Sequence, residues 1–378
     1  MDTTLQISSI GSVTFIDHIN RRYVSKRNTK ELVKQALLLI SAVSSSPKFQ
    51  SQWLRRFGLD LDLFLRTMLE CAPTASSRRY IASAITGCSV KEWSSPETAE
   101  NMRELAINWF GHLFWTFKSA GADGMFATND EIHDYFIREE VMQREGNRCL
   151  VTGVYDWCRA RRHHVPKASL DYACILPRTA RIESHLEESK RNIYDYFTET
   201  SWDILQHYAP IAFNEEQALL DQLESSANAI AMEVDAGFSF QQFLFALGPT
   251  EVPDEYVTVA YEHAINELCD IPRLRDRVAP HPHHAVPAPS SRFLQVHATI
   301  ANVLYYSRAG AAIDRINDFL GPTHPVLRRL DFDNARVTLE LGESVERMLA
   351  GVPRREKRML KGDETSSEAC ELKRRKIS

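Results

Sequence analysis

The chain has 378 residues, of which 44% are hydrophobic and 25% are charged. This composition provides enough apolar material for a buried core and predicts a soluble globular protein of two or three domains or subdomains. The longest apolar run near the start, residues 36–43, is too short to cross a bilayer, so we expect no membrane partner. Because the formal net charge is -5, any nucleic-acid interface must be a local basic patch.

The cysteine content indicates a reducing compartment. Seven cysteines are spread over the full length, and this odd, dispersed set is not typical of a disulfide framework in a chain of this size. We therefore expect free thiols and an intracellular protein, either cytoplasmic or nuclear.

The first third of the chain has the pattern of a helical region. Residues 1–28 are polar and weakly patterned, which predicts a flexible arm. Apolar residues at spacings of three and four then predict a helical N-terminal region over 29–140. Its expected helices cover 29–43, 53–69, 74–87 and 101–117. The aromatic residues of the fourth helix are expected to pack in the core; they are Trp109, Phe110, Phe114, Trp115 and Phe117.

The middle of the chain begins with two predicted strands around a basic loop, in the stretch REGNRCLVTGVYDWCRARRHHVPKASLDYACILP, residues 144–177. A short β-branched run closed by glycine predicts a strand over 148–152, and an apolar run stopped by Pro177 predicts a second over 172–176. The loop between them carries many cations and hardly an acid. Its basic and histidine residues are Arg159, Arg161, Arg162, His163, His164 and Lys167.

Further elements follow this loop in a regular order. Helical patterns occur over 182–208 and 214–223, and a strand is predicted over 229–232 with a helix over 235–242. Two more strands, 243–247 and 256–259, are expected to form a hairpin. A linker rich in proline and histidine covers 272–289, and further helical patterns cover 293–320 and 336–349. We expect His297 to be a packing residue.

The chain ends in a basic tail. Residues 351–378 contain two clusters of lysine and arginine separated by an acidic and hydroxyl-rich spacer, with few apolar residues. Such a segment cannot build a core and is predicted to be disordered. The two clusters resemble a bipartite nuclear import signal, so import machinery is an expected partner. A solvated tail with incidental charge is the alternative.

Three phrases together resemble the fungal branch of the HNH nuclease family. They are RCLVTG, DYACILP and NAIAMEVDAGFSFQQFLFAL, and the later phrase LQVHATIANVLYY resembles the helix that follows the nuclease core in that family. The resemblance implies an α+β fold, mostly helical, with a small ββα core. It places this HNH-like domain at 141–265 with a helical insertion at 179–226, followed by a linker and helical C-terminal segment at 266–350.

The resemblance also assigns the family's catalytic positions. The first histidine, a general base, falls on Cys174, the asparagine falls on Asn228, and the last histidine falls on Gly237, with Asp171 as the acid of the strand phrase. A divalent metal ion, magnesium or zinc, would be the cofactor of an active member. Because Cys174 and Gly237 replace both histidines, the resemblance implies a degenerate site.

Two metal sites from other residues are alternatives. His163 and His164 are candidate ligands that the loop could bring to the core. Cys149, Cys158, His163 and Cys174 could instead form a structural zinc site, although their spacing matches no common zinc motif. The competing interpretation is that Cys149 and Cys174 are small buried apolar residues in paired strands.

Three functions therefore remain open. The first is nucleic-acid binding with weak or absent cleavage, the second is an active metal-dependent endonuclease, and the third is a protein-interaction scaffold with no nucleic-acid role. DNA is the expected partner for the first two. The residues predicted to contact its phosphates are Arg159, Arg161, Arg162, Lys167, Arg178 and Arg181.

Overall fold

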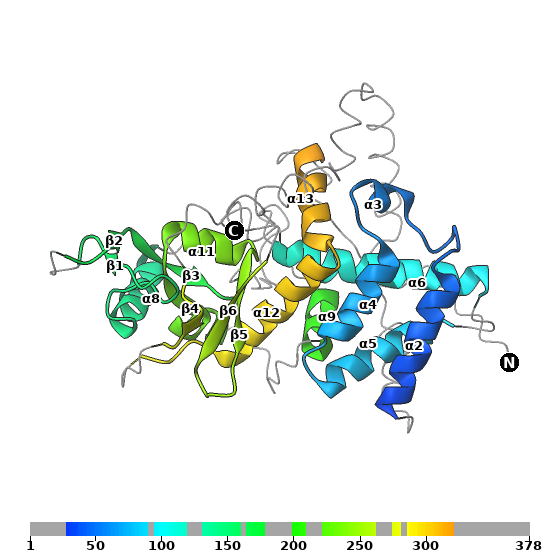
Figure 1. Cartoon of the computed structure of the whole chain (residues 1–378), viewed down its shortest axis with the longest axis horizontal. Coiled ribbons are helices and arrows are strands. Elements are labelled where there is room, and N and C mark those ends of the chain that lie inside the picture. The colour runs from blue at the N-terminus through cyan, green and yellow to red at the C-terminus, as the bar shows by residue number, and fades with distance from the viewer. Residues whose placement is uncertain are drawn as a thin grey trace, which may run out of the picture.

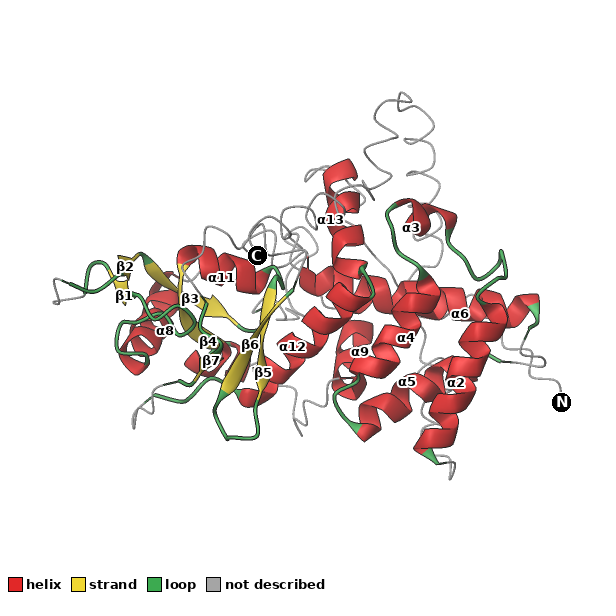
Figure 2. Cartoon of the chain, viewed as in Figure 1, coloured by secondary structure: helices red, strands yellow, loops and turns green. Residues whose placement is uncertain are grey.

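The computed structural model of the chain describes residues 28–89, 94–118, 131–159, 164–177, 199–208, 221–261, 274–280 and 286–320. Within these residues the fold is of the α+β class, with many helices and small sheets (Figure 1, Figure 2). Residues 1–27 of the predicted arm, residues 178–198 and 209–220 around the predicted insertion, and the tail at 351–378 lie outside the described residues. The same holds for parts of the linker and for the patterned piece 336–349. Asn28, the last residue of the predicted arm, caps α2.

The helical elements occupy both ends of the described chain. The first group precedes the strands and consists of α2 (Thr29–Val43), α3 (Gln52–Arg56), α4 (Leu61–Cys71), α5 (Ala75–Gly87), α6 (Pro96–Trp109), the π-helix η1 (Phe110–Trp115) and α8 (Glu131–Arg144). The later group consists of α9 (Glu199–Tyr208), the 3-10 turn η4 (Ser226–Asn228), α11 (Val234–Gln241), α12 (Ser291–Tyr306) and α13 (Ala309–Leu320).

Side-chain caps define where several of these helices begin. The Thr74 hydroxyl accepts a hydrogen bond from Ser77 N (3.0 Å), as its position before the third predicted helix suggested. Ser95 caps α6 in the same way, with Pro96 at the first position of the helix. A cap satisfies one of the unpaired N–H groups of a first turn. The aromatic residues 109, 110, 114, 115 and 117 are buried, which confirms their predicted place in the core.

Two predicted helices are each divided in two, which corrects the sequence interpretation. The segment 53–69 breaks after α3 because Gly58 has φ +87°, a left-handed conformation that ends a helix. The segment 293–320 breaks between α12 and α13, where Arg308 has φ +62°. A hydrogen bond ties α13 to the first break: Arg315 of α13 donates from Nη1 to Phe57 O at 3.0 Å. Apolar spacing continued through both breaks and could not reveal them.

The strands form small separate sheets. Strand β3 (Leu170–Cys174) pairs antiparallel with β4 (Ala229–Glu233), with Cys174 opposite Ala229. Strands β5 (Phe245–Pro249) and β6 (Tyr256–Ala260) form the predicted hairpin, and β7 (Arg277–Val278) extends it from within the predicted linker. Two short parallel strands, β1 (Tyr155–Asp156) and β2 (Lys167–Ala168), lie in the predicted loop.

The predicted strand over 148–152 is wrong. Residues 149–153 form a tight turn in which Gly153 N donates to Cys149 O (2.9 Å), with Gly153 at φ +77°. Only Arg148 makes a bridge, to Tyr155. The turn still lies beside the sheet, because Leu150 N donates to Ala231 O in β4 at 3.0 Å. Glycine therefore reverses the chain where its β-branched neighbours suggested extended structure.

One continuous apolar core links the helices to the strands. Helix α12 lies between the strands and the N-terminal helices, in contact with β5 on one side and with α4 on the other (Figure 1). His297 of α12 is buried between the rings of Phe240 and Phe243, which confirms its packing role. No helix among the described residues is long and apolar enough to cross a membrane.

Candidate functional site

The paired strands β3 and β4 bring two of the predicted site residues together. Cys174 closes β3 opposite Ala229, and the next residue, Ile175, donates from its N–H to Asn228 O at 2.8 Å. Asn228 is the last residue of η4 and so lies directly before β4. The predicted proximity of Cys174 and Asn228 is therefore confirmed.

Asn228 uses its whole side-chain amide to hold the chain where β3 ends. Its Oδ1 accepts from Leu176 N (2.9 Å), and its Nδ2 donates to Leu176 O (2.9 Å) and to Leu223 O (3.0 Å). The side chain is fully buried, so each of these bonds satisfies a backbone group that is shielded from solvent. Asn228 thus fixes the bend after Cys174 and ties it to the segment before β4.

Cys174 and Gly237 face opposite sides of the strand pair. A Cβ atom at Gly237 would lie 3.4 Å from the Ala173 Cβ and 3.6 Å from the Met232 Cβ, so α11 covers the face that carries these two residues. Because side chains alternate along a strand, Cys174 points to the other face. The two positions that the resemblance assigns to histidines therefore lie on different sides of the strand pair.

Burial further limits what Cys174 can do. Cys174 is 1% exposed, and Cys149 is fully buried. Neither cysteine forms a disulfide. The described residues therefore favour the interpretation of both as small apolar core residues, and a thiol with so little access to water is not placed to activate one.

The donor set does not fit the divalent ion of the HNH family. In the described part of the chain, no three histidine, cysteine or acidic residues lie close enough to hold a metal ion. His164 is exposed in the turn before β2, and His163 lies outside the described residues. The four-residue zinc site of Cys149, Cys158, His163 and Cys174 gains no support from this geometry, because Cys158 is exposed while the other two cysteines are buried.

Asp171, in β3, binds an arginine of α8. Its Oδ1 accepts from Tyr172 N (2.9 Å) and from Arg138 Nε (3.2 Å), and Arg138 also donates from Nη2 to Leu170 O at 3.1 Å. Asp171 is exposed, unlike Cys174. It shares the face of Ala173, so its carboxylate does not approach the Cys174 thiol.

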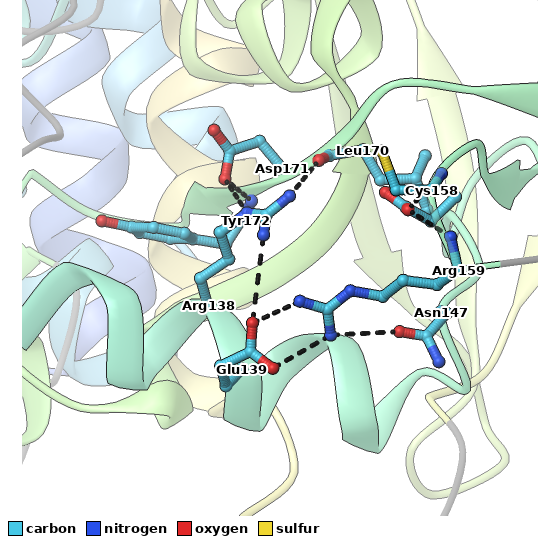
Figure 3. A network of polar contacts seen from close by, with 9 residues as sticks. Arg138, Glu139, Asn147, Cys158, Arg159, Leu170, Asp171 and Tyr172 are labelled. Atoms are coloured by element: carbon cyan, nitrogen blue, oxygen red, sulfur yellow. Dashed lines mark hydrogen bonds and ion pairs between the residues drawn. The ribbon is translucent and has the colours of Figure 1, made fainter.

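Arg159 is held by a carboxylate from α8 (Figure 3). Its Nη1 donates to Glu139 Oε2 at 3.0 Å, and its Nη2 makes a second, shorter contact with Glu139 Oε1. Arg159 Nη1 also lies 3.4 Å from Asn147 Oδ1. The hydrogen bond from Arg159 holds the pKa of Glu139 below its usual value, so this carboxylate is charged at neutral pH.

A backbone turn orients Arg159 toward this partner. Asp156 Oδ1 accepts hydrogen bonds from Cys158 N (2.9 Å) and Arg159 N (3.0 Å), so one buried aspartate organises the turn after β1. Arg138 Nη1 lies 4.0 Å from Glu139 Oε1. Four side chains from three parts of the chain therefore form one network of alternating charge, which we call the outer network: Arg138, Glu139, Arg159 and Asp171.

The outer network corrects the expectation that the basic loop lacks acids. Glu139 lies 20 residues before Arg159 in the sequence, and α8 brings it to the loop. Lys167 lies half-buried in β2. Arg161, Arg162, Arg178 and Arg181 lie outside the described residues. The sequence interpretation missed Arg138 and Glu139, and the cluster of charges at 138–140 just before the strand segment was the available signal.

Comparison of the chain with models of known protein families, with curated proteins and with solved structures found no match.

Proposed function

We propose that this chain is a nucleic-acid-binding module of the HNH nuclease type that has lost efficient cleavage. The main support is the contrast between Asn228 and the positions of the two missing histidines. Asn228 keeps a bracing role through three backbone hydrogen bonds, while Cys174 is buried and Gly237 faces the opposite side of the strand pair. Such a chain retains a scaffold without its proton-transfer group or its metal ligand.

The absence of cleavage is tested directly with purified protein and supercoiled plasmid. We expect no nicking above background with magnesium, manganese or zinc, because loss of a general base alone lowers a rate by about 10² to 10⁴. Robust nicking that disappears on Asp171→Ala or His163→Ala would overturn the proposal and support the active endonuclease. A variant with Cys174→Ala controls for a contaminating nuclease, since contaminating activity would not respond to any of these changes.

Restoring both histidines should not restore cleavage. Gly237 is buried, and a Cβ there would already be in van der Waals contact with Ala173 and Met232, so the larger imidazole of Gly237→His would have to displace neighbouring side chains. Overpacking of this kind costs about 1–3 kcal/mol. We expect the double variant Cys174→His/Gly237→His to be inactive and less stable. Metal-dependent nicking by that variant would show that the two positions can meet.

Binding is tested by fluorescence anisotropy with labelled DNA over a range of salt concentrations. We expect the triple variant of Arg161, Arg162 and Lys167 to alanine to weaken binding and to reduce the salt dependence by up to about three phosphate contacts. A control of equal charge changes Lys30 and Lys34 of α2, and Lys48 shortly after it, to alanine. In Figure 1, α2 lies at the other end of the described structure from β1 and β2. Equal losses in both variants would indicate only a general charge effect.

A protein-interaction scaffold is the second candidate, and exposed aromatic residues favour it. Tyr135 and Phe136 on α8 and Trp157 after β1 are 58%, 60% and 69% exposed. Tyrosine, tryptophan and arginine are the residues that dominate protein interfaces. Undetectable binding of single-stranded and duplex DNA and RNA at low salt would favour this candidate.

A further inference from the structure

We infer that Glu139 occupies Arg159 in place of a nucleic-acid phosphate, so that the outer network is a self-masked phosphate site. This inference rests on the proposed function and adds a form of regulation to it. The observation behind it is the two-point contact in which both terminal nitrogens of Arg159 meet the two oxygens of Glu139.

A guanidinium group binds a carboxylate and a phosphate with the same planar fork of N–H donors. A phosphate that approaches Arg159 must therefore displace Glu139 or lie beside its negative charge. Because Arg159 lowers the pKa of Glu139, the carboxylate remains ionised near neutral pH and competes at full charge. Arg138 offers no free replacement, since Asp171 binds its Nε.

The mask is accessible to solvent and can open. The Glu139 and Arg159 side chains are 33% and 31% exposed, so neither is enclosed by the core. An ion pair with this access to water contributes less to folding than a buried one, and a competing ligand can break it at lower cost. This separates the pair from a structural ion pair, which would resist displacement.

Two exposed aromatic residues indicate the form of nucleic acid: Tyr135 of α8 and Trp157, which precedes Arg159 by two residues in the chain. Tyr135, one helical turn before Glu139 on the same face of α8, lies near enough to add to the raised pKa of Arg159, after the larger effect of the Glu139 hydrogen bond. Trp157 is two residues from Arg159, and its ring is largely exposed. Exposed rings beside a cation suit unpaired bases, which stack on aromatic side chains. The occupant that we assign is therefore a single-stranded segment.

The test compares Glu139→Gln with Glu140→Gln. Both changes remove one negative charge from the same helix, but Glu140 is exposed on α8 and Arg159 forms its ion pair with Glu139. With a labelled single-stranded oligonucleotide at low salt, we expect Glu139→Gln to bind roughly 3- to 10-fold more tightly than the parent and to steepen the logarithmic salt dependence by about 0.7, as one added phosphate contact requires. Glu140→Gln should change affinity less than about 2-fold.

A second comparison assigns the gain to Arg159. The double variant Glu139→Gln/Arg159→Ala should bind no more tightly than Arg159→Ala alone, because the unmasked cation is then absent. Circular dichroism and thermal unfolding of each variant confirm that the fold is retained. If Glu139→Gln cannot be purified, the exchanged pair Glu139→Arg/Arg159→Glu, which keeps the ion pair, should bind as the parent does.

The outcomes separate this inference from the proposed function. Binding by the parent with no gain in Glu139→Gln, or an equal gain in Glu140→Gln, overturns the mask and leaves the proposed function standing. Binding by neither the parent nor Glu139→Gln overturns both. Binding that appears only in Glu139→Gln supports the mask and shows that it is nearly complete in the parent.

Discussion

Helix α8 contributes one residue to each of two arginine–carboxylate pairs, and these pairs differ chiefly in their access to water. Arg144 and Glu145 are 0% and 1% exposed, whereas the pair of Arg159 with Glu139 lies at the surface. The same two functional groups therefore occur once inside the protein and once outside it. Burial turns the inner pair into a structural element, and exposure leaves the outer pair open to exchange.

The inner pair satisfies its charge with several partners. Arg144 Nε donates to Glu145 Oε1 (2.9 Å), Nη1 donates to Ser226 O (2.9 Å) and Pro287 O (2.8 Å), and Nη2 donates to Ala229 O (2.6 Å). Burial lowers the pKa of Arg144, and the carboxylate of Glu145 opposes this shift. The guanidinium thereby joins α8, the start of β4 and the segment before α12, and it anchors the chain next to Asn228.

The largest effect that we expect comes from removal of this inner cation. Arg144→Met should lower the free energy of unfolding by about 3–5 kcal/mol, because it leaves Glu145 buried without this partner and takes one donor away from each of three carbonyl groups. Chemical denaturation monitored by circular dichroism measures the change. Arg138→Met removes an arginine from the outer face of the same helix and should cost less than about 1 kcal/mol. Equal losses would remove the distinction between the two sides of α8.

A smaller but still large effect is expected at Asn228. Asn228→Ala leaves two carbonyl oxygens and one N–H group buried without this partner, so we expect a loss of roughly 2–4 kcal/mol. Asn228→Asp keeps the shape and the acceptor for Leu176 N, but it turns a carboxylate toward Leu176 O and Leu223 O. It should therefore be no more stable than the alanine variant. Near-native stability of Asn228→Asp would show that the amide donors contribute little.

The elements around Asn228 were predictable because their signals are local. Alternating residues in 229–232 and helical spacing in 235–242 correctly indicated β4 and α11, and the hairpin of β5 and β6 followed from two short runs separated by turn residues. The prediction of a strand over 148–152 was wrong because the left-handed conformation of Gly153 closes a turn, despite the β-branched residues before it. The helix breaks at Gly58 and Arg308 were not predicted, because the spacing of apolar residues carries no information about backbone angles.

Contacts between distant residues were not predictable in the same way. Arg159 looked unbalanced because its loop contains few acids, yet its partner Glu139 comes from a helix 20 residues earlier. Arg144 gave no sign of burial, because an arginine near a helix end is typical of an exposed C-terminal turn. The packing of α8 against the strands decides that Arg144 is buried and that Arg159 lies nearer the surface. The proximity of Cys174 and Asn228 was therefore predictable from the sequence, whereas the charge balance around Arg159 was not.

A pH effect of intermediate size is expected from His297. Its Nε2 lies 2.9 Å from Phe240 O, so Nε2 carries the proton and Nδ1, which has no hydrogen-bond partner among the described residues, does not. Burial lowers the pKa of His297 to about 3, and the hydrogen bond to Phe240 opposes this shift.

The sign of this effect follows from the unfolded state, in which histidine has a pKa of about 6.5. Above that value both states are neutral at this position, and His297 causes no pH dependence. Below it the unfolded chain binds a proton that the folded chain does not, so stability falls until the pH approaches 3. At pH 5 the loss should be about 2 kcal/mol. His297→Gln, compared with the parent by denaturation between pH 5 and 8, should abolish this part of the slope. An unchanged slope would show that His297 is protonated in the folded state.

The smallest effect on stability is expected at the outer pair. Glu139→Gln should change the free energy of unfolding by less than about 1 kcal/mol, because an exposed ion pair gains little over its hydrated groups. Since the folded pKa of Glu139 is lowered, any contribution is fully present above its unfolded pKa and is lost only as the pH falls through the lower folded value. Between pH 5 and 8 the difference between Glu139→Gln and the parent should therefore be independent of pH, unlike the effect of His297. The contribution of the ion pair to the free energy of unfolding is measured by denaturation at low and at high salt, on the order of 0.05 and 0.5 M. Added salt should reduce this contribution further. A loss as large as that of Arg144→Met would show that Glu139 holds the fold together, and a carboxylate with that role could not yield Arg159 to a phosphate.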